Sequence, residues 1–166
     1  MALRNIVKEG DPILLKECRV VEKFDDKLHQ LLDDMLETMN AANGAGLAAP
    51  QVGILRRICI VQADPEAQVV ELINPTILET EGEQSGLEGC LSFPGEYGMV
   101  TRPMKVKVKA QDRSGKWFEA EGEGLKARAF CHEIDHLHGV LFKRLATRML
   151  TKEELKAALE NQEKDD

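Results

Sequence analysis

The chain has 166 residues, of which 43% are hydrophobic and 31% charged, and its formal net charge is −7 at pH 7. This length predicts a single domain spanning residues 1–166, and the composition is that of a globular protein rather than a disordered one. The acidity argues against nonspecific binding to nucleic acid or to an anionic membrane.

No run of about 18 apolar residues is present, so we expect no transmembrane helix. The charged start of the chain lacks the apolar core of a signal peptide, so we expect a cytoplasmic protein. No Cys-x-x-Cys pair occurs, and in a reducing compartment free thiols are then the expected state. The four cysteines are Cys18, Cys59, Cys90 and Cys131.

The first predicted helix covers residues 24–40. Its apolar residues recur at three- and four-residue steps, which places them on one face. They are Leu28, Leu31, Leu32, Met35, Leu36 and Met39. Asp25 or Asp26 is expected to cap the start of this helix. His29 lies off the apolar stripe and is expected to face solvent.

Two short β-favouring runs follow, at residues 58–61 and 69–73. Asn74-Pro75 comes directly after the second run. Because this dipeptide favours turns, we expect it to end the strand.

Residues 104–110 alternate strictly between lysine and apolar side chains, so Val106 and Val108 should face the core. The lysine row could form a basic patch. We favour the solvated face of an antiparallel strand, where lysines also discourage association between sheet edges. Residues 112–115 predict a hairpin turn into a further strand at 116–120.

A second helix is predicted from near Gly124 to Leu137, ending at His138-Gly139. A third begins at Thr151, where Thr-Lys-Glu-Glu fits a capping box. Together the elements predict an α+β fold in which antiparallel β-sheets wrap around a central helix, followed by a C-terminal helix.

The central helix carries the pattern His-Glu-x-x-His at residues 132–136. Residues four apart lie on one face of a helix, so His132 and His136 can converge on one metal ion. Glu133 follows the first histidine and can take a proton from water. The alternative is a helix with two exposed histidines. Apolar neighbours argue against that alternative because they bury the helix; they are Ala127, Ala129, Phe130 and Leu137.

A catalytic zinc-type site needs three protein ligands and one open position. His138 lies two residues from His136 and therefore points to the opposite side of the helix. Glu153 or Glu154 could serve a zinc peptidase, but both fall in a capped, charged turn.

The cysteines offer further candidates for the third ligand. Cys131 points about 100° away from the histidine that follows it, Cys59 lies in an apolar strand, and Cys18 has no informative context. Cys90 lies in a small-residue loop, residues 88–94, bounded by glycine and proline. A cysteine there can present its thiolate from the backbone rather than from the core.

Three motifs together resemble the peptide deformylase family. They are Gly44-Ala-Gly-Leu-Ala-Ala-Pro-Gln51, Glu88-Gly-Cys-Leu-Ser92 and His132-Glu-Ile-Asp-His136. Their order and spacing also agree with the family, and the resemblance runs from residue 6 to residue 142. The resemblance implies that Cys90, His132 and His136 are metal ligands and that Glu133 is the general base.

The same resemblance implies that the side-chain amide of Gln51 and the backbone N–H of Leu91 stabilise the oxyanion. It also implies a strand-like edge for the peptide substrate and an apolar pocket for the methionine side chain. The residues expected to bind substrate are Gly44, Ala45, Gly46, Leu47, Glu88, Gly89, Tyr97 and Ala129.

The implied reaction is metal-dependent hydrolysis of the N-formyl group from N-formylmethionyl peptides of nascent proteins, which releases formate. The family's usual metal is Fe²⁺, and Zn²⁺, Ni²⁺ or Co²⁺ can substitute; a thiolate with two imidazoles suits all four. Nascent formyl-Met peptides are the implied partners, and the acidic terminal helix gives no support for a contact with the ribosome.

Two positions depart from the commonest pattern of the family. Cys131 stands where many members carry glutamine, and Tyr97 where many carry arginine; neither is a ligand position. Within the helical motif, we also expect Asp135 to pair with Arg102 and so tie the cysteine loop to the helix.

Two other function classes are compatible with part of this pattern. Another metallohydrolase of the His-Glu-x-x-His type, such as a peptidase, is weakened by the lack of a downstream third ligand; such an enzyme would cleave unformylated peptides. A protein with a structural metal site would need four protein ligands, and only three are visible in the sequence.

Overall fold

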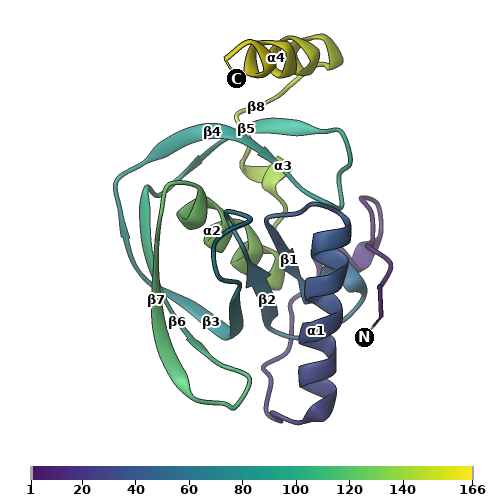
Figure 1. Ribbon diagram of the computed structural model, residues 1–166, viewed down its shortest axis with the longest axis vertical. Helices are drawn as coiled ribbons and strands as arrows, with labels where there is room; N and C mark the ends of the chain where they lie inside the picture. Colours follow the sequence, from purple (N-terminus) through teal and green to yellow (C-terminus); the bar gives the residue numbers. More distant parts are fainter. Residues whose placement is uncertain (1, 166) are drawn as a thin grey trace.

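The computed structural model describes the backbone of residues 2–165 and the side chains of residues 2–160. Four α-helices are described: α1 (Asp26–Ala41), α2 (Leu125–Leu137), α3 (Phe142–Leu145) and α4 (Lys152–Asp165). Short 3-10 helices cover Pro12–Leu15 and Ala49–Val52. The strands are β1 (Gly46–Ala48), β2 (Ile58–Val61), β3 (Val70–Glu81), β4 (Gln84–Gly89), β5 (Tyr97–Arg102), β6 (Lys105–Gln111), β7 (Trp117–Glu123) and β8 (Arg148–Met149) (Figure 1).

The strands form two antiparallel sheets. One has the strand order β1-β2-β3-β6-β7, and the other has the order β4-β5-β8. Helix α2 lies between them, surrounded by strands (Figure 1). The predicted α+β fold, with antiparallel sheets around a central helix and a helix at the C-terminus, is confirmed.

Strand β2 shows how one sheet serves two helices. Its side chains alternate between the two faces, as the pleat of a strand requires. Cys59 and Val61 pack in the cluster around α2, whereas Ile58 and Ile60 pack in the cluster around α1. Each of these four residues has at most 1% of its surface exposed. The α2 face of β2 therefore forms the floor under the helix that carries the histidines.

The prediction that Asn74-Pro75 ends its strand is wrong. Strand β3 continues to Glu81, with a shift of register against β6 between Ile73 and Thr76. Asn74 takes a left-handed conformation with φ of 52°. A β-bulge of this kind leaves one residue outside the regular hydrogen-bond ladder, and the strand then continues beyond it.

The lysine row of β6 forms neither a basic patch nor a sheet edge. Strand β6 lies between β3 and β7, and Lys105 and Lys107 stand beside glutamates of both neighbours. Lys107, for example, is paired in register with Glu79 and Glu121. Val106 and Val108 face the core, as predicted.

The predicted helix starts are confirmed. Asp25 caps α1 by accepting a 3.1 Å hydrogen bond from the N–H of Leu28, and Thr151 and Glu154 form the reciprocal bonds of a capping box at α4. His29 corrects an expectation, because its Nε2 lies 2.7 Å from the carbonyl of Arg113 and the residue is half-buried.

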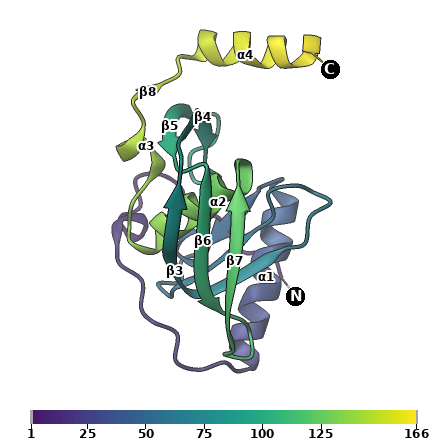
Figure 2. The same cartoon turned by 90° about the vertical axis from the view of Figure 1, so that its left-hand side faces the viewer.

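Helix α4 extends from the end of the molecule that carries β4 and β5 (Figure 2). Within residues 2–165, no helix combines the length and the apolar character needed to cross a membrane.

Candidate metal centre and active site

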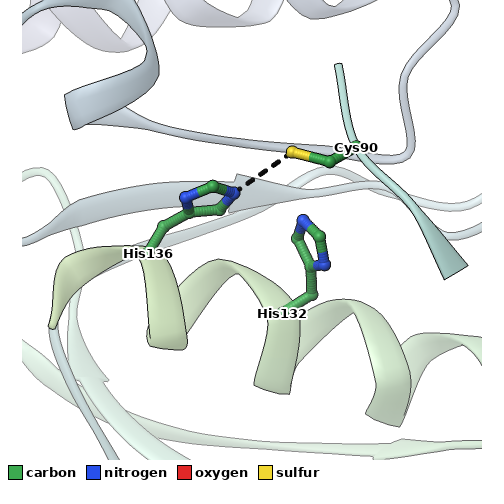
Figure 3. A group of neighbouring side chains, drawn as sticks. All are labelled: Cys90, His132 and His136. Carbon is green, nitrogen blue, oxygen red and sulfur yellow. Dashed lines mark hydrogen bonds between the residues drawn. The ribbon is translucent and has the colours of Figure 1, made fainter. Parts of the chain in front are cut away.

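Three ligand-type side chains converge above α2. His132 and His136 project from the same face of the helix, and Cys90 approaches from the end of β4 (Figure 3). Their ligand atoms lie within 4.8 Å of one another, and Cys90 Sγ is 3.4 Å from His136 Nε2. In a tetrahedral site with bonds of about 2.0–2.3 Å, donor atoms stand about 3.5 Å apart. The three residues that the sequence singled out as ligands are therefore close to the spacing that a metal ion requires.

Cys90 reaches this position because β4 stops at Gly89 and the chain then turns. The carbonyl of Cys90 accepts a 2.9 Å hydrogen bond from the N–H of Phe93. Phe93 is 1% exposed and packs edge-on against Phe142, with ring centroids 5.3 Å apart. The aromatic pair anchors the loop, so the thiol is held toward the helix by the backbone.

A buried ionic network orients the first histidine. His132 Nδ1 lies 2.6 Å from Glu88 Oε2, and Arg102 binds the same carboxylate through two nitrogens at 2.7 and 3.1 Å. Burial raises the pKa of Glu88, but the hydrogen bonds from His132 and Arg102 outweigh it and hold that pKa at about 2. The carboxylate is therefore charged at neutral pH. It directs Nε2 of His132 toward the metal centre.

The predicted pairing of Arg102 with Asp135 is confirmed. Arg102 Nη1 lies 2.6 Å from Asp135 Oδ2. Since Arg102 also binds Glu88, one guanidinium joins β5, β4 and the motif helix.

His136 has a different environment. Burial, followed by the charge of His132, lowers its pKa well below the usual value. A neutral imidazole is the form that ligates a metal, and Nε2 is the nitrogen that faces Cys90. Nδ1 is buried and has no hydrogen-bond partner among the described residues.

Glu133 lies beside the ligands, with 5% of its surface exposed. Its Oε2 is in close contact with Gly46 of β1, so that a β-carbon at this position would collide with the carboxylate. Oε1 is buried without a partner in the described part of the chain. Burial raises the pKa of this carboxyl to about 7, close to the value that suits proton transfer at neutral pH.

Two hydrogen-bond donors lie beside Cys90, the side-chain amide of Gln51 and the backbone N–H of the next residue, Leu91. The side-chain oxygen of Gln51 accepts a 2.9 Å bond from the N–H of Ala48, which turns its amide nitrogen toward Ser92 Oγ at 3.1 Å and Cys90 Sγ at 3.4 Å. The N–H of Leu91 has no acceptor among residues 2–165. The Leu91 N–H can therefore donate to an oxygen that develops negative charge, and the Gln51 amide can do so with the hydrogen now directed at Cys90 Sγ.

A cleft of about 510 Å³ opens onto this centre. Most of the residues singled out from the sequence line it. They are Gly44, Ala45, Gly46, Gln51, Glu88, Gly89, Cys90, Leu91, Tyr97, Ala129, His132 and Glu133.

The backbone of Gly44 to Gly46, which leads into β1, lines the cleft. Within the described chain β1 pairs with β2 alone. Leu47 corrects an expectation. Its side chain is fully buried in the α1 cluster and does not line the cleft.

Sequence reasoning overlooked two residues. Ser92 is fully buried and holds the amide of Gln51; it stands inside the second motif but was given no role. Arg128 is buried, lines the cleft and binds Glu88. Its position four residues before His132, on the same helical face, was the signal that could have found it.

The chain resembles known proteins over nearly its whole length. The family model described as polypeptide deformylase matches residues 3–151. A peptide deformylase of Lachnoclostridium phytofermentans is 58% identical over 86% of this chain and 88% of its own. Peptide deformylase 1 of Bacillus cereus is 54% identical over 93% of this chain and 99% of its own.

Solved structures of peptide deformylases are also similar to this chain. The crystal structure of peptide deformylase from Thermotoga maritima superposes with a TM-score of 0.84 at 42% identity, covering 87% of this chain and 98% of that one. The peptide deformylase from Synechococcus elongatus in complex with actinonin gives a TM-score of 0.83 at 40% identity, over 95% and 85% of the two chains.

Proposed function

This chain belongs to the polypeptide deformylase family and removes the N-formyl group from N-formylmethionyl peptides of nascent proteins, and we propose that Cys90, His132 and His136 hold its metal ion while Glu133 acts as general base. The observation that carries this assignment is the convergence of one thiol and two imidazoles within 4.8 Å, with a buried carboxyl beside them. We further propose that residues 1–166 form one catalytic domain.

The donor set fits a divalent metal. One thiolate and two imidazoles leave one position of a tetrahedral site for water or substrate. When bound, the metal polarises a carbonyl and lowers the pKa of water. We propose Fe²⁺ as the native ion, with Zn²⁺, Ni²⁺ or Co²⁺ able to replace it, because these donors suit all four.

Glu133 is suited to move the proton. Its carboxyl is desolvated, and its pKa of about 7 lets the group accept a proton from water and return it to the leaving amine. The close contact with Gly46 fixes the carboxylate beside β1, where the bond to be cleaved would lie.

Gln51 and Leu91 provide the donors for the oxyanion. The amide of Gln51 is held at its oxygen by Ala48 and at its nitrogen by Ser92, which leaves the hydrogen now directed at Cys90 Sγ for the oxyanion. The Leu91 N–H belongs to the loop that carries Cys90. A pair of such donors raises the rate because they bind the transition state more tightly than the substrate.

The segment Gly44 to Gly46, at the start of β1, is suited to bind the peptide backbone. Residues Gly44 to Gly46 line the cleft with little side-chain volume, so a substrate strand can approach closely and pair with β1. We propose that the first side chain of the substrate enters the cleft between Ala45, Ala129 and the backbone of Glu88, with Tyr97 and Gly89 at its rim. Because formylated chains arise at protein synthesis, we propose a cytoplasmic location.

Formate release from formyl-Met-Ala-Ser tests this function. The wild-type chain should release formate, and Glu133→Gln at equal metal content should lower kcat by about 10²–10⁴-fold, the usual contribution of a general base. Cys90→Ser should instead lower the metal content. No release by wild-type protein loaded anaerobically with iron would contradict the assignment, and unformylated peptides would then be tried.

Exposure to air tests the identity of the metal. If iron is native, protein prepared without oxygen should be more active than protein aerated for hours, and reloading with Ni²⁺ should remove the sensitivity. Equal activity before and after aeration of the iron-loaded protein would count against iron.

A further inference from the structure

Arg128 is a buried residue of the cleft that the catalytic steps above leave unused. It stands on α2, four residues before His132, and therefore on the same face of the helix. It lines the cleft, and only 9% of its side chain is exposed. A guanidinium at this depth must be held by acceptors, because an unpaired buried charge is strongly destabilising.

One nitrogen of the guanidinium is fully engaged. Nη1 of Arg128 donates to Glu88 Oε1 at 3.0 Å and to the carbonyl of Val100 at 3.1 Å. These acceptors belong to β4 and β5, so the arginine joins α2 to the three-stranded sheet. The two bonds fix the position of the planar group.

The other edge of the guanidinium is free. Neither Nε nor Nη2 donates to any residue of the described chain. Nη2 lies 3.3 Å from the place that a β-carbon would take at Gly86, so the absence of a side chain there leaves room for this nitrogen. Neither nitrogen is among the buried atoms that lack a partner, so both are accessible to water, and donors on the wall of a cleft can bind a ligand that brings an acceptor.

We propose that Arg128 is a specificity-determining residue whose free edge donates a hydrogen bond to the sulfoxide oxygen of oxidised methionine. The chain would then deformylate N-formylmethionine-sulfoxide peptides as well as N-formylmethionyl peptides. This inference rests on the proposed function, because it takes the cleft as the site of the first side chain. A thioether is a weak acceptor, whereas oxidation converts it into a polar sulfoxide of similar length.

A neutral acceptor fits the charges of the network. Arg102 and Arg128 both bind Glu88, and Arg102 also binds Asp135, so each guanidinium already has a carboxylate partner. An acidic side chain would add a charge that nothing in this set balances. The sulfoxide brings an oxygen without a net charge. The sulfoxide itself is unchanged by the reaction: water breaks the formyl C–N bond, its OH goes to formate and its hydrogen to the amine.

Three peptides measured on three proteins test the proposal. The peptides carry formylmethionine, formylnorleucine or formylmethionine sulfoxide before Ala-Ser, and formate release gives kcat/KM for each. The proteins are the wild type, Arg128→Leu and the matched control Lys126→Leu. Lys126 lies on the same helix and carries the same charge, but it does not line the cleft.

The expected result is a change of ratio. Wild type and Lys126→Leu should share one ratio of kcat/KM for the sulfoxide peptide over the norleucine peptide. In Arg128→Leu that ratio should fall by about tenfold or more, the discrimination that one hydrogen bond from a charged donor provides. Should the leucine variant fail to fold, Arg128→Lys keeps a positive charge near Glu88 but loses the planar fork, and its ratio should fall at least about threefold.

An unchanged ratio in the folded Arg128 variants would overturn the proposal, as would failure of the wild type to cleave the sulfoxide peptide while it cleaves formyl-Met-Ala-Ser. Failure on all three peptides would instead remove the proposed function.

Discussion

The carboxylate of Glu88 lies 2.6 Å from Nδ1 of His132 and is shared with Arg102 and Arg128. A histidine that donates from Nδ1 presents its Nε2 lone pair in a fixed direction, and the carboxylate also raises the basicity of the ring. Glu88 is therefore a positioning residue for the metal centre, although it is not itself in the set of converging ligands.

Replacing Glu88 should weaken metal binding. In Glu88→Gln the side chain keeps its shape but loses the charge, and metal affinity should fall by about 10–100-fold. Competition with a chromophoric chelator measures the affinity directly. Glu17→Gln is the control, because Glu17 is an exposed carboxylate that contacts His138 rather than a member of the centre. Equal affinities in the two variants would show that the contact with His132 has no influence on the metal.

Removal of Arg102 should destabilise the fold far more than removal of Asp135. Arg102 is 5% exposed, and without it Glu88 loses its bidentate partner; Arg102→Met should cost about 3–5 kcal/mol. The side chain of Asp135 is 27% exposed, so water can replace it, and Asp135→Asn should cost about 1 kcal/mol or less. Urea unfolding measures both. The paired swap Arg102→Asp with Asp135→Arg should not restore stability, because it sets two carboxylates against each other at Glu88.

A methyl group at Gly46 should disturb catalysis through Glu133. In Gly46→Ala the new β-carbon meets the Glu133 carboxylate, and a displacement of about 1 Å should lower kcat by about 10²-fold. In the background of Glu133→Asp, whose shorter side chain leaves space, the same change should have little further effect, because the two residues share one contact. Losses that simply add would argue against this coupling.

The sequence was sufficient to predict the elements whose side chains repeat regularly. Helices α1 and α2 follow from apolar residues at three- and four-residue steps, and β6 from strict alternation. The two histidines of α2 share a face for the same reason. The motif order then matched a family, which assigned Cys90 from a loop that periodicity alone could not place beside the helix.

Contacts between segments distant in the sequence could not be predicted from the periodicity of side chains. Strands β4 and β5 are rich in glycine and polar residues, so their sequences lack an alternating apolar pattern; the side-chain contact of Arg102 on β5 with Glu88 on β4 has no local sequence signal. Arg128 was overlooked because its partners, Glu88 and Val100, are 40 and 28 residues away. Leu47 was expected in the cleft, but on a three-residue strand the sequence does not indicate which face is buried.

Asp34 should make stability depend on pH in the acid range. Its buried carboxylate accepts hydrogen bonds from the N–H of Ala2 and from Gln30 and Arg4, and these bonds lower its pKa. Because the folded pKa lies below the unfolded value of about 3.9, the stabilisation is complete above that value and is lost as the pH falls through the folded pKa.

Urea unfolding of wild type and Asp34→Asn between pH 7 and pH 2 measures this dependence. The difference in unfolding free energy should be largest near neutral pH and shrink below about pH 4. Asp33→Asn is the control, since that carboxylate is exposed and contacts Arg113 instead. A difference that stays constant down to pH 2 would contradict the prediction.

Asn74 should stabilise the fold through both its backbone conformation and the hydrogen bonds of its side chain. Its φ of 52° is unfavourable for most residues, and its amide binds both the N–H and the carbonyl of Val21 at 2.9 Å. Asn74→Ala keeps the strain and leaves two buried backbone groups without partners, so it should cost about 2–4 kcal/mol. Asn74→Gly relieves the strain and should cost about 1 kcal/mol less than the alanine variant. Urea unfolding of the two variants separates the contributions: equal costs would mean that the side-chain bonds alone matter, and a glycine variant as stable as the wild type would mean that only the backbone conformation does.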